Sequence, residues 1–300
     1  MTKQTLEIAK KIDAFIKRRK RNACIAIILI MALLIIISIT TIWISSSYYQ
    51  ISGVPVLNYH QINDENITPL AVRVSHFRDE MDYLKNNGYH TITMDELYDY
   101  LAEGAPLPDK PVLITFDDGY IDNYVNAYPI LKERHMKATL FMIGDAIDTE
   151  PSRFLTTEQL QDMDKNGFSI EAHTYAHKKL TKFEEEALYN DLTKSKEVLE
   201  QILHRPVNYL AYPGGFNNKL VQATTEKAGY RLAFTVQPGN VMSGDNLYAL
   251  NRLSIFEGMD SWFSFRFRLH VAPIIASMWS LRDYLRDNGY TTLSQVVPLY

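Results

Sequence analysis

Residues 111–119 read Pro-Val-Leu-Ile-Thr-Phe-Asp-Asp-Gly, an apolar run that ends on two adjacent carboxylates. A short apolar run that stops at a turn residue is typical of a strand buried in a sheet. Further along the chain, the fragment His173-Thr174-Tyr175-Ala176-His177 follows another apolar run and places two imidazoles four residues apart. Both fragments therefore put side chains that can bind a metal where a strand is expected to end.

These fragments belong to a regular alternation of short apolar runs with amphipathic stretches. The runs predict strands at Val54–Tyr59, His90–Thr93, Val112–Phe116, Ala138–Ile143, Phe168–Glu171, Tyr209–Tyr212, Arg231–Thr235 and Asn251–Ile255. The stretches between them predict helices at Ser75–Asn87, Met94–Glu103, Asp122–Arg134, Thr157–Asn166, Glu184–Leu203 and Asn218–Ala228. Such alternation implies parallel βα units. We predict an α/β fold over residues 54–258, a distorted (β/α) barrel of about seven parallel strands.

The C-terminal ends of barrel strands are where catalytic residues gather. Asp117, Asp118, His173 and Tyr212 all lie at or just after a predicted strand end. Two imidazoles and one carboxylate can hold a divalent metal and leave a position open for water. The second carboxylate is then free to act as a general base, which is the layout of a hydrolase. The alternative is a helix N-cap beside a structural histidine.

The N-terminus carries a different signal. Residues 1–22 hold eight Lys and Arg against two acidic residues, and residues 23–44 form an apolar stretch without charge. About 22 residues at roughly 1.5 Å each can span a hydrocarbon core of about 30 Å. The basic flank predicts that this end is cytoplasmic and that the rest of the chain lies outside the cell membrane. A cleaved signal peptide is the alternative, but its apolar core of about 7–15 residues would be shorter.

Net charge and cysteine content limit the partners and the cross-links that the chain can have. The whole chain has a net charge of −4 while residues 1–22 carry +6, so the remainder carries −10. An acidic outer part argues against a nucleic-acid partner. The single cysteine, Cys24, excludes an internal disulfide. Residues 45–53 form a short polar linker that leaves the membrane segment.

Thr115-Phe116-Asp117-Asp118-Gly119 followed by the His-Thr-x-x-His fragment resembles the polysaccharide deacetylase family, known as the NodB-homology or carbohydrate esterase family 4 fold. The resemblance extends over roughly Val54 to Ile255. It implies that Asp117 is the general base. It also implies that Asp118, His173 and His177 bind the metal, for which Zn²⁺ is expected and Ni²⁺, Co²⁺ or Mn²⁺ are alternatives.

The resemblance also implies a general acid and an oxyanion donor. His60 ends the first predicted strand, as in the subgroup that deacetylates poly-N-acetylglucosamine, so we favour it as the acid. His270 lies late in the chain, where the family usually carries this residue, and is the rival. The third family motif is matched by Tyr212-Pro213-Gly214-Gly215, in which the Gly214 N–H would bind the oxyanion.

Two departures from the family pattern concern this third motif and the next. Ala211 stands where the family has an arginine that pairs with the base, and no Asp-x-x-Asp-Trp segment is present. We expect Arg252 to replace the missing arginine or to contact substrate, and we expect Tyr212 to contact substrate.

The chain end, residues 259–300, is expected to pack on the barrel as an extension. Phe263, Phe265, Phe267, Leu269 and Val271 alternate with polar residues, which predicts a half-buried strand or an aromatic segment on the membrane surface.

Together these features predict a membrane-anchored, extracellular, metal-dependent deacetylase that acts on a polysaccharide of N-acetylglucosamine. A peptidoglycan deacetylase and an inactive glycan-binding scaffold are the alternatives.

Overall fold

The computed structural model describes residues 17–38, 53–65, 68–257, 261–271, 273, 285–286 and 289. The chain divides into two units, Met1–Gln50 and Ile51–Tyr300. In the first unit, Lys17–Ser38 is a helix whose mean hydropathy reaches 2.4, long and apolar enough to cross a membrane. The helix begins earlier than the predicted 23–44 anchor, within the basic segment. Residues 39–44 of that anchor, and most of the 45–53 linker, lie outside the described residues.

The second unit is built on a curled parallel sheet. Its strands follow the order β10-β1-β5-β6-β7-β8-β9, and β4 pairs with β5. The bounds are β1 Val56–Tyr59, β4 His90–Thr91, β5 Pro111–Asp118, β6 Ala138–Met142, β7 Phe168–Ala172, β8 Tyr209–Ala211, β9 Leu232–Phe234 and β10 Leu253–Ser254. All these pairings are parallel. A two-stranded parallel sheet, β2 Gln61–Ile62 and β3 Ala71–Val72, lies apart from it. The predicted distorted barrel is confirmed.

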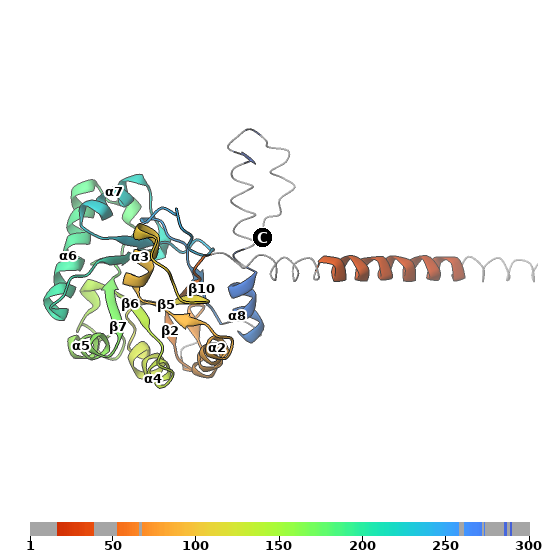
Figure 1. Ribbon diagram of the computed structural model, residues 1–300, viewed down its shortest axis with the longest axis horizontal. Coiled ribbons are helices and arrows are strands. Elements are labelled where there is room, and N and C mark those ends of the chain that lie inside the picture. The colour runs from red at the N-terminus through yellow and green to blue at the C-terminus, as the bar shows by residue number, and fades with distance from the viewer. Residues whose placement is uncertain are drawn as a thin grey trace, which may run out of the picture. The chain divides into compact units, whose positions relative to one another are not determined.

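Helices surround the sheet (Figure 1). They are α2 Val74–Asn86, α3 Met94–Glu103, α4 Tyr128–Glu133, α5 Thr157–Lys165, α6 Glu185–Leu203 and α7 Lys219–Lys227, with a π-helical turn η1 at Asn123–Ala127 before α4. Thr93 caps α3 in a capping box with Glu96, and Thr156 caps α5 with Gln159. These reciprocal hydrogen bonds satisfy backbone N–H groups that a helix start leaves free. The first residues of α3 and α5 are therefore determined by their own capping residues.

The core has an outer and an inner part because side chains alternate along each strand. On β5, Val112 and Ile114 join the large cluster under the helices, whereas Leu113 packs with Phe141 and Phe234 inside the curled sheet. The same alternation carries Thr115 and Asp117 to the inner side. The base candidate therefore emerges from the strand facing the interior.

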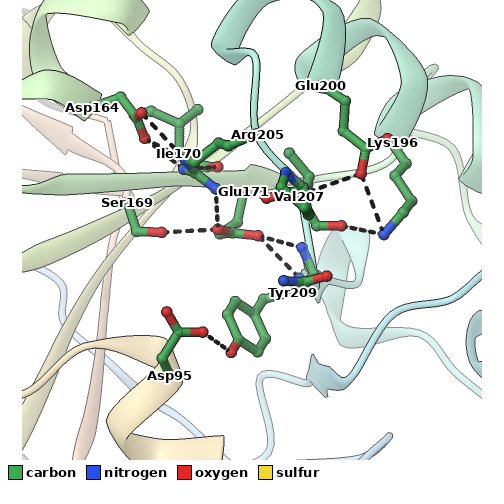
Figure 2. A network of polar contacts seen from close by, with 12 residues as sticks. Asp95, Asp164, Ser169, Ile170, Glu171, Lys196, Glu200, Arg205, Val207 and Tyr209 are labelled. Carbon is green, nitrogen blue, oxygen red and sulfur yellow. Dashed lines mark hydrogen bonds and ion pairs between the residues drawn. The ribbon is translucent and has the colours of Figure 1, made fainter.

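A polar network crosses from α5 to the start of β8 (Figure 2). Glu171 on β7 accepts hydrogen bonds from Ser169, from Arg205 and from the backbone N–H groups of Asn208 and Tyr209. Arg205 also binds Asp164 on α5. This network satisfies a carboxylate that is only 2% exposed, and it involves none of the predicted site residues.

The predicted strand after residue 259 is wrong. Ser261–His270 forms a helix, α8, whose Phe265 and Leu269 are buried while Phe267 is 41% exposed. Burial four residues apart is the helical period, so one face of α8 is apolar and the alternation along the sequence is incidental. Phe265 packs edge-on against Tyr83 of α2, with ring centroids 6.0 Å apart. Most of the remaining 259–300 segment lies outside the described residues.

Candidate active site

The carboxyl ends of β5 and β7 bring the predicted ligands together. Asp118 is the last residue of β5, and His173 and His177 follow β7. Asp118 Oδ1 lies 3.4 Å from His173 Nε2 and 3.2 Å from His177 Nε2. One ligand atom from each residue lies within 4.8 Å of the others, which is the spacing of a metal triad. His177 is 41% exposed at its side chain, so the cluster opens toward solvent.

The hydrogen bonding of the triad fits a cation. His173 Nδ1 donates to the carbonyl of Ala211 at 2.8 Å, since a carbonyl can only accept. In the neutral ring, Nε2 then presents its lone pair toward Asp118. Asp118 Oδ1 is buried and has no hydrogen-bond partner among the described residues. Lone pairs that face one another in a buried position are stabilised by a bound divalent ion, so these residues fit the metal that the motif implies.

The pKa of Asp118 agrees with a ligand role. Burial alone would raise the pKa of this carboxyl. The contacts with His173 and His177 outweigh burial and hold the pKa below its usual value. Burial would also lower the pKa of His173, but Asp117 and Asp118 together raise it. Asp118 is therefore an anion at neutral pH, which is the form that binds a cation.

Three residues of the triad region have a left-handed backbone. The φ angles are 75° at Asp118, 66° at Thr174 and 49° at His177. Non-glycine residues rarely adopt this region, and for a β-branched residue such as Thr174 it is strained. Gly119 follows with φ 80°, and a Cβ there would lie 2.0 Å from Met142 Sδ. The ligand loops are held in shapes that their own backbone does not favour.

Asp117 is paired with Arg252. The guanidinium donates to both carboxylate oxygens at 2.7 Å, and its Nε donates to the Thr235 carbonyl. Burial would raise the pKa of Asp117, but Arg252 and then His173 outweigh it and lower the pKa. Asp117 is thus ionised, as a general base must be. Arg252 thus makes the contact with the base candidate that the missing family arginine would make. Its side chain is 0% exposed but also lines the cavity described below, so a contact with substrate stays a prediction.

A cavity of about 530 Å³ opens over these groups. His60, Asp117, Asp118, His173 and His177 line it, together with Gly214 and Arg252. Asn123 Nδ2 donates to the backbone carbonyl of His60 at 2.7 Å, which fixes the chain there. His60 Nδ1 is buried without a partner among the described residues. Burial lowers the pKa of His60, while Asp117 and Asp118 act to raise it.

His270 does not reach this cavity. Its Nε2 lies 3.0 Å from the hydroxyl of Tyr83 on α2, and burial lowers its pKa. The geometry therefore favours His60 over His270 as the acid.

Gly214 lies in the turn η4, Pro213–Gly215, with φ 60°. A Cβ at Gly214 would come 2.9 Å from the ring of Phe216, so the turn requires a glycine both for its angle and for its contact. This leaves the backbone of Gly214 exposed on the cavity wall.

The polysaccharide deacetylase family model matches residues 104–233. A Bacillus subtilis (strain 168) protein described as a polysaccharide deacetylase, YxkH, is 37% identical over 220 residues, which cover 73% of this chain and 77% of the relative. The chain belongs to the polysaccharide deacetylase family. This membership confirms the resemblance read from the two motifs. As a member of this family of hydrolytic N-deacetylases, the protein is an enzyme.

Two further members of the family bear on this deacetylase. The poly-β-1,6-N-acetyl-D-glucosamine N-deacetylase of Staphylococcus aureus (strain MSSA476) is 27% identical over 266 residues, covering 76% of this chain and 91% of the relative. Among solved structures, the Streptococcus pyogenes deacetylase PplD in complex with acetate superposes with a TM-score of 0.67 at 29% identity, covering 70% of this chain and 95% of that one. The fold and the family are thus supported independently.

One predicted site residue of this deacetylase is placed elsewhere. Tyr212 was expected to contact substrate, but it is 0% exposed and packs in the core. Its hydroxyl donates to the Tyr248 carbonyl at 3.1 Å. The ring points away from the cavity because Tyr212 continues the in–out alternation of β8, where Ala211 faces the interior.

Sequence reasoning also missed a carboxylate behind the histidine loop. Asp191 on α6 is 9% exposed and accepts from the backbone N–H groups of Tyr175 and Ala176. The available signal was its position on the buried face of α6, between Leu188 and Leu192. An acidic residue on an apolar helix face requires a partner, although the sequence does not say which one.

Proposed function

We propose that this deacetylase hydrolyses the N-acetyl groups of a β-linked N-acetylglucosamine polysaccharide at the outer face of the cell membrane, with a divalent metal, most suitably Zn²⁺. The observation that carries the proposal is the convergence of Asp118, His173 and His177 beside the Arg252-paired Asp117 in one cavity. The S. aureus relative named for poly-β-1,6-N-acetyl-D-glucosamine supports the substrate class. The apolar helix Lys17–Ser38 supports a membrane anchor.

The side chains divide the reaction between them. A divalent cation held by the triad would polarise the acetamide carbonyl and acidify water. Asp117 accepts the proton of the attacking water while Arg252 holds its carboxylate in place. The Gly214 N–H donates to the oxyanion, a contact typically worth about 2.7–4 kcal/mol in the transition state. His60 then protonates the departing amine, because an amine anion is a very poor leaving group. Acetate and a glucosamine unit are the products.

The first test separates the base from the metal ligands. Asp117→Asn keeps the shape of the side chain but removes the acceptor of the proton, so kcat should fall by about 10²–10⁴-fold. Bound metal, measured by elemental analysis of the purified protein, should stay at the wild-type level. Asp118→Asn is the matched control, since it should lose metal and activity together. Equal metal loss in the two variants would contradict the assignment of Asp117 as base.

The second test addresses substrate. Acetate release is measured from defined β-1,6 and β-1,4 N-acetylglucosamine oligomers and from isolated cell-wall glycan. Preference for the β-1,6 series supports the proposal. Release from cell-wall glycan alone would identify a peptidoglycan deacetylase. Binding of oligomers without acetate release, with Zn²⁺, Co²⁺ or Ni²⁺ supplied, would identify a glycan-binding scaffold.

A further inference from the structure

The loop between the two histidine ligands has a shape that it cannot keep by itself. Thr174 and His177 both have left-handed φ angles, and the amides of Tyr175 and Ala176 lie between them. Successive N–H groups in such a turn point toward one side and form a concave anion-binding site, known as a nest. Thr174 Oγ1 accepts from the His177 amide at 3.1 Å, so the turn also closes on itself.

The carboxylate of Asp191 occupies this nest. Its Oδ2 accepts from the Tyr175 amide and its Oδ1 from the Ala176 amide, each at 3.1 Å. Asp191 comes from the middle of the 19-residue helix α6, a rigid element outside the loop. The ammonium of Lys194, one turn further along α6, lies 3.8 Å from the ring centroid of Tyr175. Helix α6 therefore contacts the backbone of the loop through Asp191 and the ring of Tyr175 through Lys194.

The other side of the loop is fixed by the segment after β6. The amides of Gly144 and Asp145 donate to the carbonyls of Thr174 and Tyr175 at 3.0 and 2.9 Å. A Cβ at Gly144 would lie 2.9 Å from the Tyr175 ring, so the two chains are in close contact. The loop carbonyls are thus bonded to the segment after β6, whereas the amides of Tyr175 and Ala176 are bonded to Asp191.

We infer that Asp191 is a positioning residue for the metal: its carboxylate sets the backbone turn that directs His177 toward Asp118 and His173. This inference deepens the proposed function and rests on its metal triad. Without the carboxylate, the amides of Tyr175 and Ala176 lose their acceptor. The strained turn can then relax to another backbone conformation. His177 is the ligand that moves, because His173 is separately anchored through its bond to Ala211.

The test measures metal binding by the full-length protein and needs no turnover. Co²⁺ is titrated into metal-free wild type and variants while its visible absorption is followed, and unfolding of each metal-free protein is measured in parallel. Asp191→Ala should weaken Co²⁺ binding by about tenfold or more, as for other groups that orient ligands. Asp191→Glu, which keeps two acceptor oxygens, should recover part of the affinity. Asp191→Asn should lie between them, because it keeps one acceptor oxygen and replaces the other with an NH₂ group, which cannot accept from the second amide.

A matched control separates positioning from stability. Asp164→Ala removes a partly buried helix carboxylate from the Arg205 network (Figure 2). Among the described residues the Asp164 side chain bonds to Arg205 and not to the histidine loop. It should lower the free energy of unfolding and leave Co²⁺ affinity at the wild-type level. Wild-type affinity in Asp191→Ala, or in Asp191→Asn if the alanine variant does not fold, would overturn the inference. Failure of the wild type itself to bind Co²⁺ would instead overturn the proposed function.

Discussion

At the scale of single residues, the same side chain serves different purposes according to its neighbours. His60 lines the cavity beside Asp117, and its Nδ1 has no partner in the part of the chain that the structure describes, whereas His270 is bonded to Tyr83 on α2. Both imidazoles have a pKa lowered by burial, so the pKa does not distinguish them. Their positions distinguish the two imidazoles, because a general acid must reach the leaving nitrogen.

This contrast gives a prediction for the two histidines. His60→Ala should reduce kcat for acetate release by about 10²–10⁴-fold, because the amine then departs without a proton donor. His270→Ala should keep kcat near the wild-type value and lose only about 1 kcal/mol of stability with the Tyr83 hydrogen bond. Steady-state acetate release and denaturant unfolding measure the two effects. A larger loss of kcat in His270→Ala than in His60→Ala would reverse the assignment.

At the scale of elements, α2 carries a carboxyl group that burial keeps protonated at neutral pH. Glu80 is 4% exposed and accepts from the Tyr59 hydroxyl of β1 at 2.8 Å. Burial raises the pKa of Glu80 to about 8, against an ordinary value of 4.5. Glu257 after β10 and Asp79 on α2 also raise this pKa, while Tyr59 and Arg268 of α8 lower it. Glu80 is thus protonated at neutral pH where α2 packs against its neighbours.

The stability contribution of this carboxyl should depend on pH. Between pH 4.5 and 8 the folded state binds a proton that the unfolded state has released, so its stability falls as pH rises through this window. The loss should reach on the order of 3–5 kcal/mol above pH 8. Glu80→Gln should remove this dependence. Asp79→Asn, a change at an exposed neighbour on the same helix, should keep most of it, because burial raises the pKa of Glu80 more than Asp79 does. Denaturant unfolding at pH 5.5, 7 and 9 tests this; equal slopes in wild type and Glu80→Gln would contradict it.

At the scale of the whole molecule, the helix that could cross a membrane and the candidate active site belong to different units. The helix Lys17–Ser38 has no buried residues, whereas Ile51–Tyr300 contains the sheet, both core clusters and the site. A helix of this length and apolar composition is stable in a lipid environment.

Removal of residues 1–50 should therefore release the protein from membranes without loss of activity. The full chain should sediment with membranes and require detergent, and the 51–300 fragment should appear in the supernatant with the same kcat/KM on soluble oligomers. Membrane fractionation and acetate release measure both. If the fragment still sediments with membranes, a second contact must exist, for which the exposed Phe267 of α8 is the first candidate.

Local sequence pattern is enough to predict the architecture and the residues that could hold a metal. Both predictions use only local patterns: the spacing of apolar residues and the turn residues that follow them predict where each strand ends. Asp117, Asp118, His173 and His177 lie at or just after such ends, where the catalytic residues of a barrel gather. The predicted strands lie within a few residues of those observed. The parallel barrel then brings the strand ends together, because the carboxyl ends of its parallel strands lie at the same edge of the sheet.

Only the folded chain shows which distant groups support those residues. Arg252 was expected from the sequence either to pair with the base or to contact substrate, and in the fold it pairs with Asp117. Asp191 reaches the histidine loop from α6 and Tyr212 turns into the core, neither of which the sequence predicted. The chain end is helical because α2 offers an apolar surface for one face of α8. In each case the partner lies far along the chain, so its identity depends on packing in three dimensions and cannot be read from local pattern.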